Sequence, residues 1–106
     1  MTYVVDIDGT ICTQSNPDYE NAIPIQENID KVNELYNDGH QIIYNTARGM
    51  GRTNNDQVAA NTLLYEMTRK QLDKWGVKYH MLFLGKPAGD VYIDDKAIRA
   101  DDFFEN

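Results

Sequence analysis

The sequence predicts an α/β fold, a minimal Rossmann-like three-layer sandwich with a parallel sheet of four to five strands. Two observations lead to this prediction. Short apolar runs alternate along the chain with longer segments in which apolar residues recur at helical spacing, and this alternation is typical of parallel sheets that carry helices on their faces. The 106 residues are enough for one hydrophobic core, so residues 1–106 are expected to form a single domain.

The strands are expected at four apolar runs that lack helical spacing. These runs cover residues 2–7, 41–44, 79–84 and 91–93. Residues 11–24, which follow the first strand, are polar and contain two prolines, so they are expected to form a loop or a small flap.

Two amphipathic helices are expected between the strands. The first starts near Ile25 and is expected to end at Gly39. The second follows a loop rich in glycine and asparagine, residues 47–56, and ends near Trp75. The last residues, from Lys96 onward, are expected to form a short helix or a tail.

The composition disfavours several classes of partner. The formal net charge is −7, and such a surface repels nucleic acid and anionic membranes at long range. No apolar run is long enough to span a membrane, and the first residues lack the pattern of a signal peptide. The single cysteine, Cys12, has no partner for an internal disulfide, which suits a reducing compartment. We therefore expect a cytoplasmic protein with no membrane partner.

Polar side chains follow the end of every expected strand. In parallel sheets the ligand binds beyond the carboxyl ends of the strands. Side chains from four distant segments are therefore expected to meet at one edge of the sheet. In chain order these residues are Asp6, Asp8, Thr46, Lys86, Asp94 and Asp95.

This set of side chains suits phosphoryl transfer from a phosphate monoester. A carboxylate can attack phosphorus and form an acyl phosphate, and Mg²⁺ reduces its repulsion from the phosphate. A second acid protonates the leaving oxygen and later activates water. Asp6 and Asp8 lie on the same side of an extended strand, and Gly9 allows a sharp turn after them. Thr46 adds a hydrogen-bond donor and Lys86 a positive charge.

Taken together, these motifs resemble those of the haloacid dehalogenase (HAD) superfamily of phosphohydrolases. The resemblance covers nearly the whole chain, and four motifs in the family's order form a specific signal. The motifs are Asp6-Ile7-Asp8-Gly9-Thr10, Thr46 after a strand, Gly85-Lys86-Pro87, and Asp94-Asp95 after Val91-Tyr92-Ile93.

The resemblance implies a role for each motif. It implies that Asp6 is the nucleophile, and that Asp8 is the general acid and base whose backbone carbonyl also binds Mg²⁺. Thr46 and Lys86 are implied to hold the phosphoryl group. The metal ligands implied for Mg²⁺ are Asp6, Asp8, Asp94 and Asp95, the last either as a direct ligand or as a neighbour that supports one.

Residues beside these motifs are expected to contact the substrate. Arginine forks suit phosphate and carboxylate groups, and Arg48 lies only two residues after Thr46. The expected substrate-binding residues are Gly9, Thr10, Ala47 and Arg48.

The resemblance is to small members of the superfamily that lack a cap domain. Neither residues 11–40 nor the stretch from Thr46 to Lys86 leaves room for a cap. We therefore expect an open site, or one closed by another subunit, and a homo-oligomer. The segments around Thr46 and Asp94 also resemble small phosphatases of capsule and surface-polysaccharide synthesis, which implies a sugar phosphate or another small phosphorylated substrate.

Three other interpretations remain open from the sequence. One is a polynucleotide 3′-phosphatase, although the net charge of −7 and the lack of a basic stripe oppose it. A second is a signalling receiver module, although the expected third strand, residues 79–84, lacks the acceptor aspartate that such modules carry. The third is a phosphate-binding protein without catalytic activity.

Overall fold

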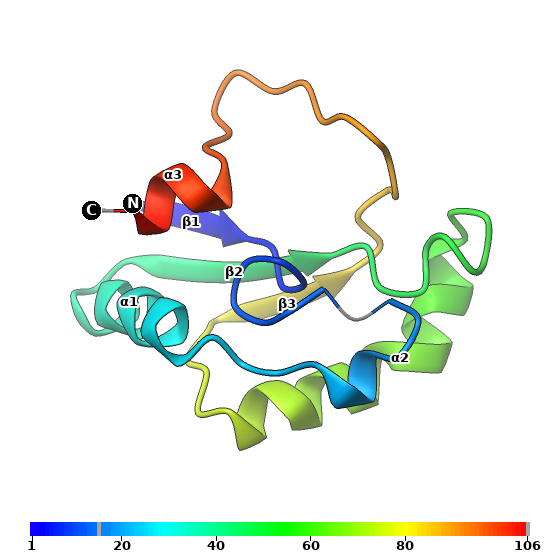
Figure 1. Cartoon of the computed structure of the whole chain (residues 1–106), viewed down its shortest axis with the longest axis horizontal. Helices are drawn as coiled ribbons and strands as arrows, with labels where there is room; N and C mark the ends of the chain where they lie inside the picture. Colours follow the sequence, from blue (N-terminus) through cyan, green and yellow to red (C-terminus); the bar gives the residue numbers. More distant parts are fainter. Residues whose placement is uncertain (15, 106) are drawn as a thin grey trace.

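A computed structural model describes residues 1–14 and 16–105 of the chain and contains a parallel three-stranded sheet (Figure 1). The strands β1 (Thr2–Val5), β2 (Gln41–Thr46) and β3 (Met81–Leu84) lie side by side in the order β1-β2-β3, so β1 and β3 are the edge strands. The α/β class and the parallel sheet are confirmed. The predicted count of four to five strands is not confirmed, because the described residues form a sheet of three strands.

Two helices make the crossover connections between the strands. Helix α1 (Gln26–Asn37) joins β1 to β2, and α2 (Gln57–Lys74) joins β2 to β3. The Asp56 side chain caps α2 by accepting a hydrogen bond from the backbone N–H of Ala59 at 3.1 Å. A short 3₁₀ turn, η1 (Tyr19–Asn21), precedes α1, and a short helix, α3 (Ala100–Phe104), lies beside the start of β1 (Figure 1). None of the helices in the described part of the chain is long and apolar enough to cross a membrane.

The core lies between the sheet and these two crossover helices. Along β2, every second residue is buried, because successive side chains of a strand point to opposite faces. Ile42 and Tyr44 share one cluster with Ile29 and Val32 of α1 and with apolar residues of α2. Helices α1 and α2 therefore cover the same face of the sheet, as two right-handed crossovers in one direction require.

The opposite face of the sheet differs from the expected three-layer sandwich. Val4, Ile43 and Met81 lie in register across the three strands and point away from the core. Val4 is 64% exposed and Met81 is 44% exposed, so no helix in the described part of the chain covers them. The third layer fails to form because the residues after β3 do not cross this face.

The residues after β3 form an open arch instead of the expected fourth strand. The arch, residues 89–98, leaves the carboxyl edge of the sheet and returns to α3 at the amino end of β1 (Figure 1). Residues 91–93, predicted to be a strand, have no regular structure, and every residue of the arch is exposed. The prediction of a strand at residues 91–93 was wrong for the single chain. A strand needs a neighbouring strand to pair with, and the arch has none among the described residues.

One polar group in the core is unsatisfied and offers a test of the packing. The Tyr44 hydroxyl is buried without a hydrogen-bond partner among the described residues. A buried hydroxyl without a partner costs about 1–3 kcal/mol. We expect Tyr44→Phe to raise the free energy of unfolding by about 1 kcal/mol, measured by urea denaturation. A loss of stability would show that the hydroxyl is hydrogen-bonded in solution.

Candidate active site

A cleft of about 310 Å³ lies at the carboxyl edge of the sheet. Three of the four motif segments meet there, one from each strand of the sheet, as expected for ligand sites in parallel sheets. Among the residues that line the cleft are Asp6, Asp8, Thr46, Ala47, Arg48 and Lys86.

Asp6 directly follows β1, and its carboxylate is 36% exposed in the cleft. The Lys86 Nζ lies 3.7 Å from Oδ1 of Asp6, and the Thr10 hydroxyl approaches Oδ2 at 3.5 Å. Burial raises the pKa of Asp6 above its usual value, and the positive charge of Lys86 partly offsets this effect. A further cation beside Asp6 would therefore favour its charged form.

Asp8 is held in a bidentate ion pair with Arg48. The Arg48 Nε donates to Oδ2 of Asp8 at 2.8 Å, and the Nη2 donates to Oδ1 at 2.9 Å. The Arg48 side chain is fully buried, and that of Asp8 is 11% exposed. Two parallel charge-assisted hydrogen bonds fix the plane of the carboxylate. Arg48, predicted to contact the substrate, thus has its guanidinium committed to Asp8.

Three residues that the sequence analysis missed hold Arg48 in place. The Arg48 Nη1 donates to Oε1 of Gln71 at 2.7 Å and to the hydroxyl of Thr68 at 3.3 Å. The ring of Tyr19 lies 5.0 Å from the guanidinium carbon, within the range of cation–π attraction. One feature of the sequence could have indicated such a role for Thr68. It lies between Leu64 and Leu72 on the buried side of α2, where polar residues are uncommon unless they bind a partner.

Thr46 and Lys86 are joined through the backbone. The Lys86 N–H donates to the carbonyl of Thr46 at 3.2 Å. The Thr46 hydroxyl accepts a hydrogen bond from the backbone N–H of Arg48 at 3.2 Å, so its own hydrogen can point into the cleft. The Lys86 ammonium also lies 4.5 Å from the centre of the Tyr92 ring. The lysine is therefore held between Asp6 and an aromatic face.

The tight turn after β1 brings Gly9 and Thr10 close to the carboxylates. Gly9 has a φ of +81°, and its N–H donates to the carbonyl of Cys12 at 2.8 Å. Thr10 is buried and reaches Asp6 through its hydroxyl, whereas neither Gly9 nor Thr10 is among the residues that line the cleft. Of the four expected substrate-binding residues, Ala47 and Arg48 line it.

Cys12 lies beside the site as a buried thiol. Its Sγ is 3.5 Å from Oδ1 of Asp8 and 3.9 Å from Nη2 of Arg48. Burial, together with the nearby Asp8 carboxylate, raises the pKa of the thiol to about 12. A thiol with this pKa stays protonated at neutral pH and is a poor nucleophile.

Asp94 and Asp95 lie outside the cleft in this single chain. Both are exposed on the arch, and Oδ1 of Asp94 accepts a hydrogen bond from the Lys96 backbone N–H at 2.8 Å. In the described residues, no three His, Cys, Asp or Glu side chains are close enough together to hold a metal ion. The expected convergence therefore holds for Asp6, Asp8, Thr46 and Lys86, and it does not hold for Asp94 and Asp95.

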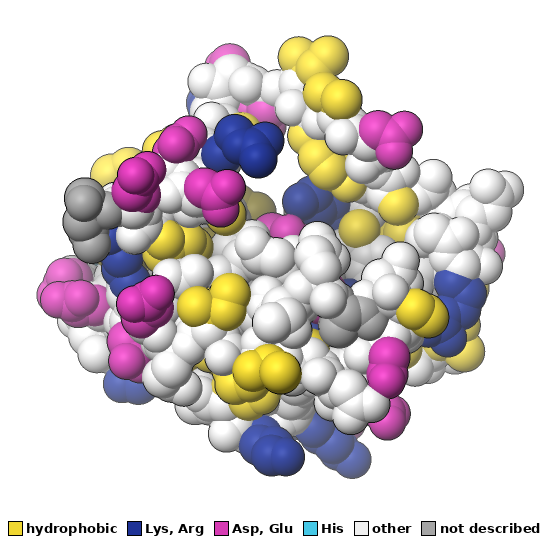
Figure 2. Space-filling model, viewed as in Figure 1, with side chains coloured by type: hydrophobic (Ala, Val, Ile, Leu, Met, Phe, Trp, Pro, Cys, Tyr) yellow, Lys and Arg dark blue, Asp and Glu magenta, His cyan; other side chains and the backbone are white. Residues whose placement is uncertain are grey.

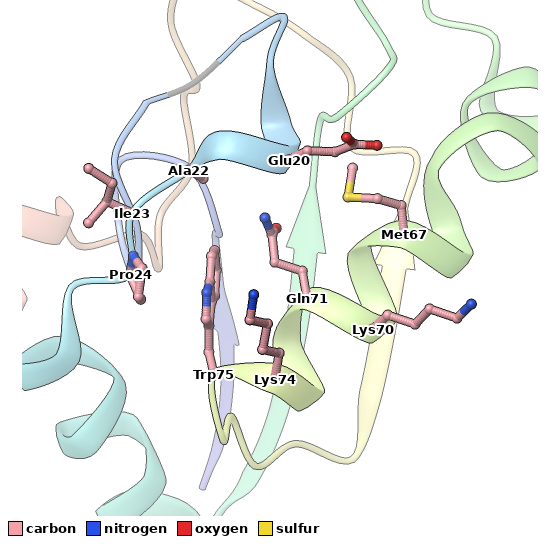
Figure 3. A pocket seen from close by; sticks show the side chains of 9 residues that line it. All are labelled: Glu20, Ala22, Ile23, Pro24, Met67, Lys70, Gln71, Lys74 and Trp75. Atoms are coloured by element: carbon pink, nitrogen blue, oxygen red, sulfur yellow. The ribbon is translucent and has the colours of Figure 1, made fainter.

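A second groove, of about 520 Å³, lies between η1 and the end of α2 (Figure 3). Trp75, Lys70 and Lys74 are among its lining residues, and Glu20 is the only carboxylate among them. Gln71 also lines this groove while it hydrogen-bonds Arg48. Because it lacks a pair of carboxylates, the groove does not offer the chemistry described for the cleft.

Comparison with known proteins agrees with this fold. No protein-family model and no curated protein sequence matches the chain. A crystal structure of a Vibrio cholerae protein matches with 30% identity and a TM-score of 0.90, covering 99% of this chain and 88% of that one.

A second match is a D,D-heptose 1,7-bisphosphate phosphatase of the HAD superfamily from B. bronchiseptica, crystallised with magnesium and phosphate. It has 15% identity and a TM-score of 0.54, and the match covers 91% of this chain. The chain spans about half of that phosphatase, 53% of its length. This chain therefore has a HAD-like fold and belongs to the same family as the Vibrio cholerae protein.

Proposed function

We propose that the protein is a Mg²⁺-dependent phosphomonoester hydrolase that forms an aspartyl phosphate on Asp6. One observation carries the proposal. Asp6 and Asp8 share a cleft with the Lys86 ammonium, which lies 3.7 Å from the Asp6 carboxylate, and with the Thr46 hydroxyl. This combination provides a nucleophile, a second carboxylate for proton transfer, and positive charge and a donor for the phosphoryl oxygens.

In the first step, a carboxylate oxygen of Asp6 attacks phosphorus, and the bond from phosphorus to the ester oxygen breaks. Lys86 and the Thr46 hydroxyl stabilise the charge on the phosphoryl oxygens. In the second step, water attacks the aspartyl phosphate, which releases inorganic phosphate and restores the Asp6 carboxylate. The overall products are an alcohol and phosphate.

Asp8 supplies the proton transfers in both steps. It gives a proton to the leaving oxygen in the first step and removes one from the attacking water in the second. Arg48 donates to both carboxylate oxygens of Asp8, and the Cys12 thiol donates to Oδ1, so the orientation of the carboxylate in the cleft is fixed. Arg48 thus acts as a positioning residue for Asp8.

The residues of the cleft suit a magnesium ion. Mg²⁺ binds through one or two carboxylates, water and substrate phosphate, and Asp6 offers a partly exposed carboxylate whose raised pKa a cation would lower. Asp6 and the backbone carbonyl of Asp8 would hold the ion. When bound, it would neutralise charge between the nucleophile and the phosphate.

The substrate is proposed to be a small phosphorylated metabolite, in particular a sugar phosphate. The cleft of about 310 Å³ is at the small end of ligand sites. The net charge of −7 disfavours polyanions such as DNA. The heptose bisphosphate named for the B. bronchiseptica enzyme is a sugar phosphate of this kind.

Removal of the metal tests this proposal. Purified protein with Mg²⁺ should release phosphate from p-nitrophenyl phosphate and from members of a sugar-phosphate panel. An excess of EDTA should lower the rate by about 100-fold or more, because the metal contributes several kcal/mol to the transition state, and added Mg²⁺ should restore it. Equal rates with and without metal, or no phosphate release from any member of the panel, would refute the proposal.

A further inference from the structure

The arch and the edge of β1 are two unpaired elements that complement each other. Strand β1 lies at the edge of the sheet, so one row of its backbone groups has no strand partner within residues 1–14 and 16–105. The arch carries Val91, Tyr92 and Ile93, which have high strand propensity and are 77%, 51% and 97% exposed. Hydrophobic side chains gather along the arch at the top of the molecule (Figure 2).

The arch cannot pair in parallel with β1 of its own chain. Its start is tied to the carboxyl edge of the sheet, because the Lys86 N–H donates to Thr46 and the Ala88 N–H donates to Asn55 at 2.9 Å. Only residues 89–90 remain before Val91, and they span at most about 10 Å. A parallel strand would have to begin at the amino edge, about 13 Å away along the sheet and about 14 Å across it.

The other end of the arch fixes its direction. The Phe103 ring of α3 lies 6.1 Å from the Tyr3 ring of β1, and Phe104 packs on the core, so the arch ends at the amino side of the sheet. The arch therefore runs from the carboxyl edge to the amino edge, opposite in direction to β1 (Figure 1).

We propose that two copies of the chain exchange these strands, so that residues 91–93 of each copy pair in parallel with β1 of the other. A two-fold axis perpendicular to the strands makes the two β1 strands antiparallel. An arch that is antiparallel to its own β1 is then parallel to the partner's β1. Each arch stands clear of its own β1, and the exchanged strand of the second copy fills that space.

The exchange completes the candidate active site in trans. A strand over residues 91–93 that runs parallel to β1 ends at the same edge of the sheet as Asp6. It delivers Asp94 and Asp95 of one copy to the cleft of the other, whose lining among the described residues includes no carboxylate besides Asp6 and Asp8. This assignment of Asp94 rests on the proposed function, whereas the exchange itself rests on the geometry of the arch and β1.

The oligomeric state tests the exchange without reference to activity. The wild-type protein should sediment at micromolar concentration as a dimer of 12.2 kDa chains. Ile93→Asp should give a folded monomer, because Ile93 is 97% exposed in one chain and would be buried only in the exchanged sheet. Ile23→Asp, a matched change at a residue that is 65% exposed and lies in the segment before α1, should remain a dimer. A wild-type monomer, or a dimer that survives Ile93→Asp, would overturn the proposal.

Complementation tests the contribution of Asp94 to the partner's site. Asp6→Asn and Asp94→Asn chains with different affinity tags are co-expressed, and the mixed dimer is isolated. Each homodimer should be inactive, and the mixed dimer should recover about half of the wild-type activity because one of its two sites is intact.

If the mixed dimer is as inactive as both homodimers, each site uses its own Asp94. The exchange in trans is then rejected while the proposed function stands. If Ile93→Asp disrupts the dimer but the wild type has no phosphatase activity, the proposed function fails and the exchange stands.

Discussion

Asp6→Asn is expected to lower kcat for phosphate release by about 10⁴-fold or more, the scale seen when a covalent nucleophile is removed. The amide of asparagine is a poor nucleophile and carries no charge for Mg²⁺. The fold should persist, because the Asp6 side chain is partly exposed, its contacts with Lys86 and Thr10 are long, and asparagine has nearly the same shape as aspartate. Steady-state kinetics with p-nitrophenyl phosphate measures the effect.

Asp38→Asn is the matched control for this change. Asp38 is exposed at the C-terminal end of α1, and the same loss of one negative charge there should leave kcat within about two-fold of wild type. An Asp6→Asn protein with normal kcat would remove Asp6 from the mechanism.

Arg48→Met is expected to have the largest effect on stability, a loss of about 3–5 kcal/mol in the free energy of unfolding. The change leaves the nearly buried Asp8 carboxylate without its bidentate partner, and it also removes the hydrogen bonds to Thr68 and Gln71. For a chain of this length, the melting temperature should fall by about 12 °C or more. Thermal denaturation followed by circular dichroism measures the shift.

Two further variants separate this effect from a simple loss of charge. Arg48→Lys keeps the charge but not the fork geometry, so it should fold, with a smaller loss of stability and a lowered kcat. Arg52→Met removes an exposed arginine from the same loop and should change stability by less than about 0.5 kcal/mol. If Arg48→Met were as stable as Arg52→Met, the ion pair with Asp8 would have no structural role.

The sequence predicted the parts of the fold that depend on local patterns. Apolar runs placed all three strands, and helical periodicity placed α1 and α2 to within two residues at most ends. The rule that parallel strands present ligands at their carboxyl ends brought Asp6, Asp8, Thr46 and Lys86 into one cleft. These predictions succeeded because each depends only on a short segment of the chain, namely a strand and the residues directly after it.

The parts that failed depend on distance through space. Residues 91–93 have the composition of a strand, but a strand forms only beside a partner. The hydrogen bonds of Lys86 and Ala88 at the carboxyl edge prevent residues 91–93 from pairing in parallel with β1 of the same chain. The role of Arg48 was missed for a similar reason. Its ion pair joins residues that are forty positions apart in the chain. The sequence does not indicate whether the guanidinium of Arg48 contacts Asp8 or a substrate.

The most direct test of the central claim is to search for the covalent intermediate in Asp8→Asn protein. This variant keeps the nucleophile Asp6 but lacks the base that activates water, so phosphorylated enzyme should accumulate with an activated donor such as acetyl phosphate. After acid quenching and proteolysis, mass spectrometry should find one added phosphoryl group on the peptide that contains Asp6, and hydroxylamine should remove it. A phosphoryl group on any other residue, or its absence in a protein that still binds phosphate, would contradict the account.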